Sequence, residues 1–521
     1  MTTFVVGLDG ADWSLLDQYA DRGDHPAFDR LRTEGTTGSM ETTFPPVTSP
    51  AWQCFATGKN PGKLGVYGWM TFDHDSQKID FADASKFQSD RVWDVLARNG
   101  HRVGVINVPT TYPPECEDSV LLIAGNGTLR GKEFTSPQSL KSELLERIPE
   151  YRIMMRNCID NSDPTELINE ATTLFDQRFE AAQWLADEKD CDVVIMTLFH
   201  TDTVQHSLWD EPETMQPMYE HIDRHLSQLL DDEDTDGVFL LSDHGFQELE
   251  TVFLPNQWLL ERGDITIRES NVTDSSRRLL HRLGITREQF MHLFDRLGIE
   301  DLMAELVPQR FKRTIPHDDT LLPIQEADVD WSETRAVSLG LGSIYINPAA
   351  FDGEAERTAY TDELKTAIAE LETPSGQPVA NHVYDGEEIW DGNRGGQPDL
   401  FLDYTPGIDG SKVGIDGPVF NPDSGSKQWV GQHGKTGIFA AYGAGIEAGS
   451  VDVSIYDIAP TILHYLDTPI PEDVDGTVQH SVFTDRIADR GIERGPPTAT
   501  DTDAGEAQKE VEETLKDLGY L

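Results

Sequence analysis

Short, continuous runs of apolar residues recur along this chain and alternate with stretches of helical pattern. Runs of this length suit strands that are buried on both faces of a sheet. Their alternation with helices predicts an α/β fold, in which a mostly parallel central sheet lies between helical layers. In such sheets ligands bind beyond the carboxyl ends of the strands, so polar residues directly after the runs are candidates for function. The runs lie at residues 3–8, 102–107, 119–124, 192–198, 237–241, 399–403 and 437–441.

Six residues with metal-ligating side chains follow these runs or stand beside one. They offer three carboxylates and three imidazoles, a set that suits two divalent ions such as zinc or manganese. In the stretch HTDTVQH, the i, i+4 spacing of Asp and His places both side chains on one face of a helical turn. An Asp after a strand is equally typical of a helix N-cap, so the prediction depends on the ordered set. The six are Asp9, Asp202, His206, Asp243, His244 and His433.

A pair of hydroxyls, Thr48 and Ser49, precedes Pro50 in the stretch TFPPVTSPAW. Residues before a proline favour extended backbone, and proline suits the first turn of a helix, so the pair would stand where a helix begins. One interpretation is a helix cap. The other is a nucleophile, because a divalent ion can activate a hydroxyl that is otherwise weak near neutral pH.

The order of these motifs resembles the alkaline phosphatase superfamily. It is closest to the type I phosphodiesterase and nucleotide pyrophosphatase branch, with its archaeal and bacterial phosphohydrolase and phosphomutase relatives. The resemblance covers roughly residues 1–485 and implies an alkaline phosphatase-like fold. It rests on ATGKNPGKLG after Thr48, SDHG at 242–245, GQHG at 431–434, INVPTTYPP at 106–114, GLGSIYIN at 340–347 and DIAPTILHYLDTPIPEDVDG at 457–476.

The resemblance also implies a role for each site residue. One metal ion would be held by Asp202, His206 and His433, and the other by the remaining three ligands, Asp9, Asp243 and His244. Thr48 would face the second ion as the nucleophile and form a covalent phosphothreonine that water then hydrolyses. Asn107, in the INVPTTYPP stretch, is a candidate substrate contact. Where nucleotide pyrophosphatases have an Asn three residues after the nucleophile, this chain has Ala51, which leaves the nucleotide assignment open.

We therefore expect a metal-dependent phosphohydrolase that cleaves a phosphodiester or phosphomonoester. A phosphotransferase or phosphomutase is an alternative, because the ligands alone do not decide whether water or another hydroxyl accepts the phosphoryl group. A sulfatase is disfavoured, because the stretch TSPAW lacks the Arg of the C/S-x-P-x-R pattern. A binding protein that kept the fold and lost turnover is the non-enzymatic alternative.

The chain divides into three predicted parts. The catalytic core covers 1–255 and 325–485, an inserted helical cap covers 256–324, and a flexible linker with a terminal helix covers 486–521. Helical patterning and a local excess of Arg mark the cap in an otherwise acidic chain. Arg277, Arg278 and Arg282 are candidate contacts for an anionic substrate, although Arg stems that pack on a helical surface would give the same pattern.

The composition restricts which partners and which cellular compartment we expect. The formal net charge of −52 disfavours nucleic acid as a partner and fits a halophilic, archaeal source whose salt-rich cytosol screens the charge. No apolar stretch approaches the ~20 residues of a membrane helix, and the first residues, MTTFVVGLDG, do not resemble a signal peptide. The four cysteines form no CxxC pair. These features predict a cytoplasmic protein with reduced thiols, compatible with a homodimer.

Overall fold

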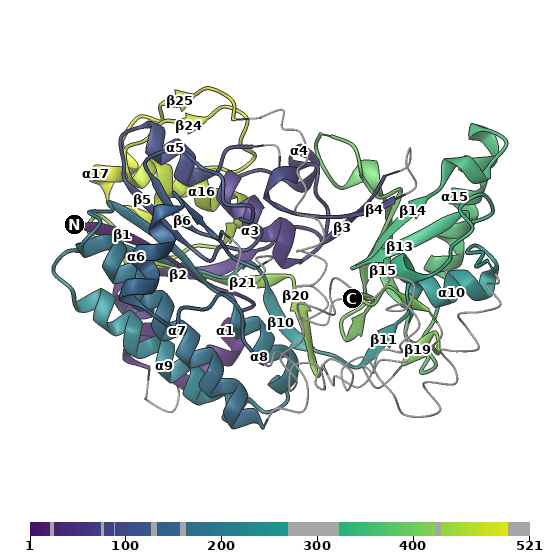
Figure 1. Ribbon diagram of the computed structural model, residues 1–521, viewed down its shortest axis with the longest axis horizontal. Coiled ribbons are helices and arrows are strands. Elements are labelled where there is room, and N and C mark those ends of the chain that lie inside the picture. Colours follow the sequence, from purple (N-terminus) through teal and green to yellow (C-terminus); the bar gives the residue numbers. More distant parts are fainter. Residues whose placement is uncertain are drawn as a thin grey trace.

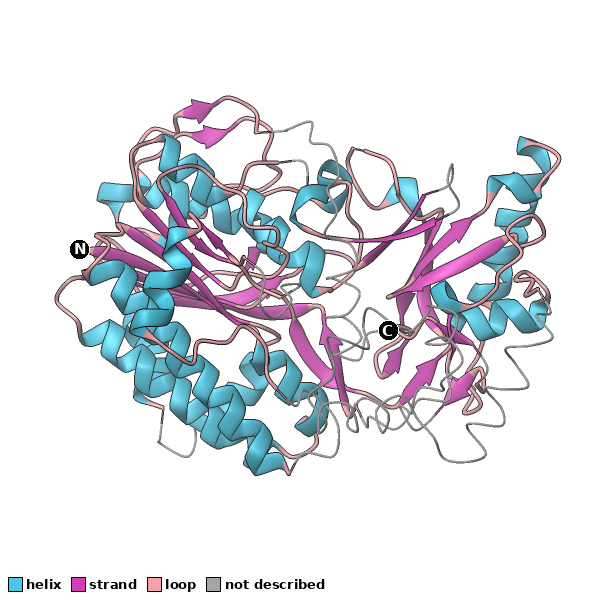
Figure 2. Ribbon diagram, viewed as in Figure 1, coloured by secondary structure: helices cyan, strands magenta, loops and turns pink. Residues whose placement is uncertain are grey.

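A computed structural model of the chain describes residues 1–20, 25–73, 78–87, 89–126, 133–156, 163–268, 322–392, 394–415, 417–421 and 429–498. These residues form two lobes (Figure 1). The larger lobe is built on a sheet with helices on both faces, and the smaller lobe is built mainly on strands (Figure 2). Among the described helices, none is both long enough and apolar enough to cross a membrane.

The central sheet has ten strands, and its middle is parallel, as predicted. Antiparallel pairing occurs toward the two edges, where β21 joins β9, β2 joins β21 and β7 joins β6. The order is β22 (Gly449–Ser450), β2 (Thr36–Glu41), β21 (Thr436–Gly443), β9 (Thr235–Leu241), β1 (Thr2–Leu8), β8 (Val193–Leu198), β5 (Val103–Ile106), β6 (Val120–Ile123) and β7 (Thr135–Ser136), with β23 (Val453–Ser454) also pairing with β2.

Two hydrophobic cores cover the two faces of this sheet. Along β1, Phe4 and Val6 belong to one core and Val5 to the other, because successive strand side chains point to opposite faces. The first core is shared with α1 (Trp13–Ala20), α2 (Pro26–Glu34), α6 (Ser139–Arg147), α7 (Pro164–Asp187), α8 (His200–Leu208) and α9 (Pro212–Asp231). The second is shared with α3 (Thr48–Thr57), α5 (Val92–Arg98) and α16 (Ile455–Tyr465).

The smaller lobe has a core of its own around a four-stranded antiparallel sheet. Its elements include β3 (Met70–Asp73), β4 (Lys78–Phe81), α10 (Pro255–Arg262), β11 (Thr251–Phe253), β12 (Leu322–Pro323), β13 (Ala336–Gly340), β14 (Ser343–Ile346), α15 (Glu354–Ala369), β15 (Ala380–Asp385), β16 (Leu400–Tyr404), β17 (Ile408–Asp409), β18 (Gly414–Ile415) and β19 (Phe420–Asn421). Short elements complete the larger lobe: α4 (Pro61–Leu64), α17 (Asp485–Ala488), β24 (Ile470–Pro471) and β25 (Arg494–Gly495).

The prediction placed one strand in the wrong sheet. The run 399–403 forms β16 of the antiparallel sheet, whereas the other six runs lie in the central sheet as predicted. The side chains of β16 are buried like those of a central strand, so its hydrophobic pattern could not show which core it joins. Most of the predicted helical cap, at 269–321, and the predicted terminal helix lie outside the described residues.

A two-stranded ribbon joins the lobes. In it, β10 (Gly245–Glu248) pairs antiparallel with β20 (Gly431–Gly434), and Phe246 stands opposite His433. Because β10 closely follows β9 and β20 precedes β21, the chain leaves and re-enters the central sheet through this ribbon. The described residues between 249 and 430 belong to the smaller lobe and its connections.

Gly7 of β1 leaves the space that the Trp52 ring of α3 fills. A Cβ at Gly7 would lie 2.2 Å from Cη2 of Trp52. Gly7→Ala is therefore expected to lower the free energy of unfolding by about 1–3 kcal/mol, measured by urea denaturation in high salt. Gly104→Ala is the matched control in β5, because its Cβ would meet a Leu185 methyl at 2.9 Å, at the flexible end of that side chain. Equal losses in both variants would contradict this account.

Candidate active site

Three adjacent parallel strands bring the predicted carboxylates to one edge of the central sheet. Asp9 follows β1, Asp243 lies two residues after β9, and α8 begins two residues after β8 and carries Asp202 and His206. Strands β8 and β9 flank β1 and run parallel to it, so their carboxyl ends meet at the same edge. All three Asp side chains are buried.

The ribbon supplies the most distant predicted ligand. His433 of β20 pairs with Phe246 of β10, two residues after His244. The rings of His244 and His433 stack with centroids 3.8 Å apart. The antiparallel register therefore holds side by side two imidazoles that are 189 positions apart in the sequence (433 − 244).

The first predicted metal group forms a nearly equilateral triangle. Asp202 Oδ1 lies 3.3 Å from His206 Nε2 and 3.2 Å from His433 Nε2. The two Nε2 atoms lie 3.2 Å apart. Zinc bonds of about 2.0–2.1 Å in a tetrahedron place neighbouring ligand atoms about 3.3 Å apart, so these spacings fit one zinc ion.

The second predicted group gathers around His244. Its Nε2 lies 3.5 Å from Asp9 Oδ1, 3.3 Å from Asp243 Oδ2 and 3.3 Å from Thr48 Oγ1. A carboxylate oxygen of Asp202 also lies within 4.8 Å of the ligand atoms of Asp9 and His244. Asp202 thus stands close to both groups, which the sequence did not predict.

Backbone carbonyls fix the orientation of all three imidazoles. Nδ1 of His206 contacts Gly431 O at 2.8 Å, and Nδ1 of His433 contacts Pro46 O at 2.8 Å. Nδ1 of His244 lies 3.0 Å from the carbonyl oxygen of the next residue. A carbonyl only accepts hydrogen bonds, so each Nδ1 carries a ring proton, and Nε2 is the nitrogen that can ligate when the ring is neutral. Histidines that ligate metal ions are held in this way.

The Asp9 and Asp243 carboxylates are each anchored through one oxygen. Trp52 Nε1 donates to Asp9 Oδ2 at 2.8 Å, and Gly10 N donates to Asp243 Oδ1 at 3.1 Å. Within the described part of the chain, the other oxygens, and Oδ1 of Asp202, are buried and accept no hydrogen bond. Buried oxygens of this kind, aimed at imidazole lone pairs, fit divalent cations as their missing partners.

Electrostatics favour the same assignment. Burial, together with the nearby Asp243 and Asp202, raises the pKa of Asp9 well above its ordinary value. Burial raises the pKa of Asp243 to about 7. Burial also lowers the pKa of His244, which keeps that ring neutral and able to ligate. The charged forms of Asp9 and Asp243 are therefore destabilised, whereas His206 and His433 outweigh burial and lower the pKa of Asp202. Positive charge from divalent ions would stabilise the ionised forms of Asp9 and Asp243.

Thr48 lies inside the first turn of α3 and does not cap it. Val47 is the N-cap residue, and it makes no side-chain capping hydrogen bond. The Thr48 side chain is buried, and its hydroxyl is directed at His244. The helix-cap interpretation of Thr48 is therefore wrong. The N-cap interpretation of Asp9 fails as well, because Asp12 is the Asp that accepts from the backbone at the start of α1, at Ser14 N.

A pocket opens beside the first group. Its base includes His206 and His433, and its walls are largely apolar and aromatic. Trp429 stacks on the His206 ring at 3.9 Å, and Lys435 is the cation of the lining. Lining residues from the smaller lobe include Leu341, Phe401, Leu402, Tyr404, Ile408 and Trp429.

The other predicted contacts are not brought into this cluster by any described interaction. Asn107 is buried, its Nδ2 donates to Ala124 O at 2.6 Å, and its Oδ1 accepts from the Tyr151 hydroxyl at 2.5 Å. The Asn107 amide thus both donates and accepts a hydrogen bond within the protein. The predicted substrate contacts Arg277, Arg278 and Arg282 lie outside the described residues.

Sequence reasoning missed two aromatic residues of the site. Trp52, which anchors Asp9, stands one helical turn after Thr48, and this spacing could have indicated that both approach the same strand ends. Trp429 lies two residues before the ribbon strand that carries His433. Nothing in the sequence indicated this role for Trp429, because its ring meets His206 only when two distant segments of the chain pack together.

Comparison with known proteins identifies a matching family and structures of similar fold. The sequence matches the family described as type I phosphodiesterase / nucleotide pyrophosphatase over residues 3–408. No curated protein matches the chain at a significant level.

Two solved structures illustrate the shared fold. The human ectonucleotide pyrophosphatase / phosphodiesterase 5 structure is 14% identical with a TM-score of 0.52, and the match covers 92% of this chain and 97% of that one. Phosphonoacetate hydrolase from Sinorhizobium meliloti 1021, in complex with phosphonoacetate, is 13% identical with a TM-score of 0.54, and the match covers 88% and 94%. Both share the mostly parallel α/β core.

Trp52→Phe tests the anchoring of Asp9. The variant keeps an aromatic ring but leaves Asp9 Oδ2 without its indole donor, so zinc affinity is expected to fall about 10- to 100-fold. Competition with a chromophoric chelator measures the change. Trp93→Phe is the matched control, because Trp93 is buried in the same core. Unchanged affinity in Trp52→Phe would show that the indole does not support the carboxylate.

Proposed function

The chain belongs to the type I phosphodiesterase / nucleotide pyrophosphatase family, and we propose that it hydrolyses a phosphate ester through a covalent intermediate on Thr48. Family membership supports a phosphoester hydrolase, and the nucleophile and its ligands are our inference. The observation that carries the proposal is the convergence of the Thr48 hydroxyl with three carboxylates and three imidazoles in one buried cluster.

Two groups of residues would hold two divalent ions. Asp202, His206 and His433 form one group, and the remaining predicted ligands, Asp9, Asp243 and His244, form the other. Bound ions of the zinc or manganese kind would lower the pKa of coordinated hydroxyl groups and offset the negative charge that builds up on phosphate oxygens.

The chain's own residues account for the covalent step. Thr48 Oγ1 forms a bond to phosphorus, its proton passes to solvent, and the bond from phosphorus to the leaving oxygen breaks on the opposite side. Water then attacks phosphorus, releases the phosphate product and restores the threonine. Thr48 is the first residue of α3, so the phosphoryl group would lie at the positive end of a ten-residue helix.

The pocket indicates the kind of leaving group. Its aromatic and aliphatic walls suit an apolar or planar organic group, and the charge of Lys435 in the lining is paired with Asp403 at 2.5 Å. Among relatives of this fold, an inactive threonine-to-alanine variant of murine ectonucleotide pyrophosphatase / phosphodiesterase 5 was solved in complex with AMP. An organic phosphodiester is therefore the first substrate class to assay.

Thr48→Ala is expected to lower turnover of bis-p-nitrophenyl phosphate by at least about three orders of magnitude, because the variant lacks the attacking oxygen. Ser49→Ala is the matched control. Its hydroxyl is also buried but accepts and donates no hydrogen bond among the described residues, so its loss should change turnover far less. Metal content and circular dichroism should match the wild type in both. Turnover that survives in Thr48→Ala and disappears in Ser49→Ala would move the nucleophile by one residue.

Acid quenching during turnover provides direct evidence for the intermediate. We expect mass spectrometry to find a phosphoryl adduct on the peptide that contains Thr48, bearing the ester group when the substrate is a diester. Added acceptor alcohols distinguish hydrolysis from transfer, because a transferase would form new esters at the expense of free phosphate. Absence of any adduct under single-turnover conditions would contradict the covalent mechanism.

Removal of metal ions should abolish activity reversibly. Dialysis against a chelator in high salt is expected to eliminate hydrolysis, and Zn²⁺ or Mn²⁺ should restore it, because Mg²⁺ fits a set of three imidazoles poorly. Metal analysis should find about two more ions per chain in the wild type than in a variant that combines Asp9→Asn with His433→Ala. Full activity after chelation would contradict the metal-dependent mechanism.

A further inference from the structure

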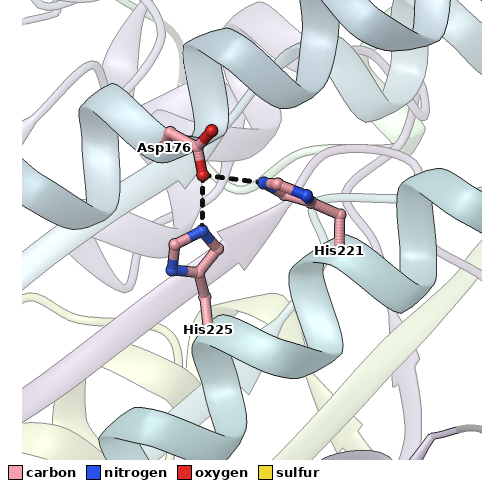
Figure 3. Close-up of side chains that lie close together, drawn as sticks. All are labelled: Asp176, His221 and His225. Atoms are coloured by element: carbon pink, nitrogen blue, oxygen red, sulfur yellow. Dashed lines mark hydrogen bonds and ion pairs between the residues drawn. The ribbon is translucent and has the colours of Figure 1, made fainter.

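A second cluster of metal-ligating side chains lies on the helical layer, apart from the active site. His221 and His225 project from α9 at i, i+4 spacing, and Asp176 projects toward them from α7 (Figure 3). The two helices pack against each other in the layer that covers one face of the sheet (Figure 1). None of these residues belongs to the proposed catalytic set.

The three side chains converge on one point. Both imidazole Nε2 atoms approach the same carboxylate oxygen, Asp176 Oδ1, at 2.8 Å for His221 and 2.7 Å for His225. One ligand atom from each residue lies within 4.8 Å of the others. The His225 ring is also held in place, because it stacks on Phe179 of α7 with centroids 4.3 Å apart and planes 6° apart.

We propose that Asp176, His221 and His225 bind a divalent transition-metal ion, with Zn²⁺ as the expected occupant, and that this ion links α7 to α9. Two imidazole nitrogens and one carboxylate oxygen are ligands that zinc prefers, whereas Mg²⁺ and Ca²⁺ prefer oxygen alone. The Asp176 side chain is 56% exposed and those of the two histidines about one fifth exposed, so water can complete the coordination.

The site needs only a small adjustment to accept the ion. Ligand atoms of tetrahedral zinc stand about 3.3 Å apart, so the two nitrogens and the carboxylate oxygen must separate by roughly 0.5 Å. Asp176 is the most exposed of the three, and a change in its rotamer provides this movement. A neutral imidazole is the form that ligates, and burial lowers the pKa of His225.

Arg224 competes with the ion for His221. Its Nη2 lies 2.6 Å from His221 Nδ1, and a guanidinium only donates, so Nδ1 accepts and the ring proton sits on Nε2. Coordination through Nε2 requires that this proton move to Nδ1 and that Arg224 withdraw. Arg224 is exposed, so it can withdraw into solvent, and removing this competitor for His221 should strengthen metal binding.

The experiment compares zinc binding between single variants of the full chain. Equilibrium dialysis at micromolar free Zn²⁺, with an excess of Mg²⁺ to occupy exposed acidic groups, is followed by elemental analysis. His221→Ala and Asp176→Asn should each bind one ion fewer per chain than the wild type. This test does not depend on the proposed function. Any ions at the proposed active site contribute equally to the zinc content of the wild type and of each variant, so they cancel when the two are subtracted.

Two further variants make the test specific. Gln216→Ala is the matched control on α9, since it removes the i, i+4 hydrogen bond to Glu220 but no metal ligand, and its zinc content should equal the wild type. Arg224→Gln should bind the ion several-fold more tightly. Equal zinc content in wild type, His221→Ala and Asp176→Asn would overturn the proposal. So would a loss of zinc in Gln216→Ala as large as that in His221→Ala.

Thermal unfolding gives an independent readout. Added Zn²⁺ should raise the Tm of the wild type more than that of His221→Ala, because only the wild type can link the two helices. Circular dichroism first establishes that both proteins are folded, and Asp176→Asn provides a second comparison at an exposed position. Identical zinc-dependent shifts in all three proteins would contradict the link between α7 and α9.

Discussion

The confinement of three carboxylates in one buried cluster is the constraint on which the rest of the proposed active site depends. Repulsion among these groups is costly in a poorly hydrated interior, and the surrounding structure offsets it with fixed donors. The Trp52 indole and the Gly10 amide each hold one carboxylate oxygen, and backbone carbonyls orient the imidazoles toward the remaining oxygens. Even the absence of a side chain at Gly7 contributes, since the Trp52 ring occupies that space.

The two lobes contribute different parts of the proposed enzyme. The central sheet and the ribbon supply the nucleophile and the ligands, whereas the smaller lobe supplies much of the pocket wall. In the proposed enzyme, the reacting groups and much of the substrate-facing wall would therefore belong to different hydrophobic cores. Proteins of the same fold were solved with ligands as different as AMP and phosphonoacetate, so the fold alone does not identify the substrate.

The sequence predicted the central sheet, and it placed the six candidate metal ligands at or near strand ends, because strand burial constrains both. Apolar runs identify strands that are covered on two faces, and chemistry at the ends of such strands is constrained by topology. The run 399–403 was assigned to the wrong sheet because burial does not reveal which core covers a strand. The position of Asp202 near both groups, and the contact of Trp429 with His206, depend on three-dimensional spacing that residue order does not encode.

The ribbon of β10 and β20 has an evolutionary consequence. Glu248 and Gly431 face each other in its register, so the whole intervening segment begins and ends at neighbouring points. Such a segment behaves as a cassette: it can lengthen, shorten or be exchanged for another without altering the topology of the sheet. The ribbon itself cannot tolerate a shift of one residue, because that shift would turn His433 to the opposite face. Diversification of this lineage should therefore concentrate between these two strands and spare the strands themselves.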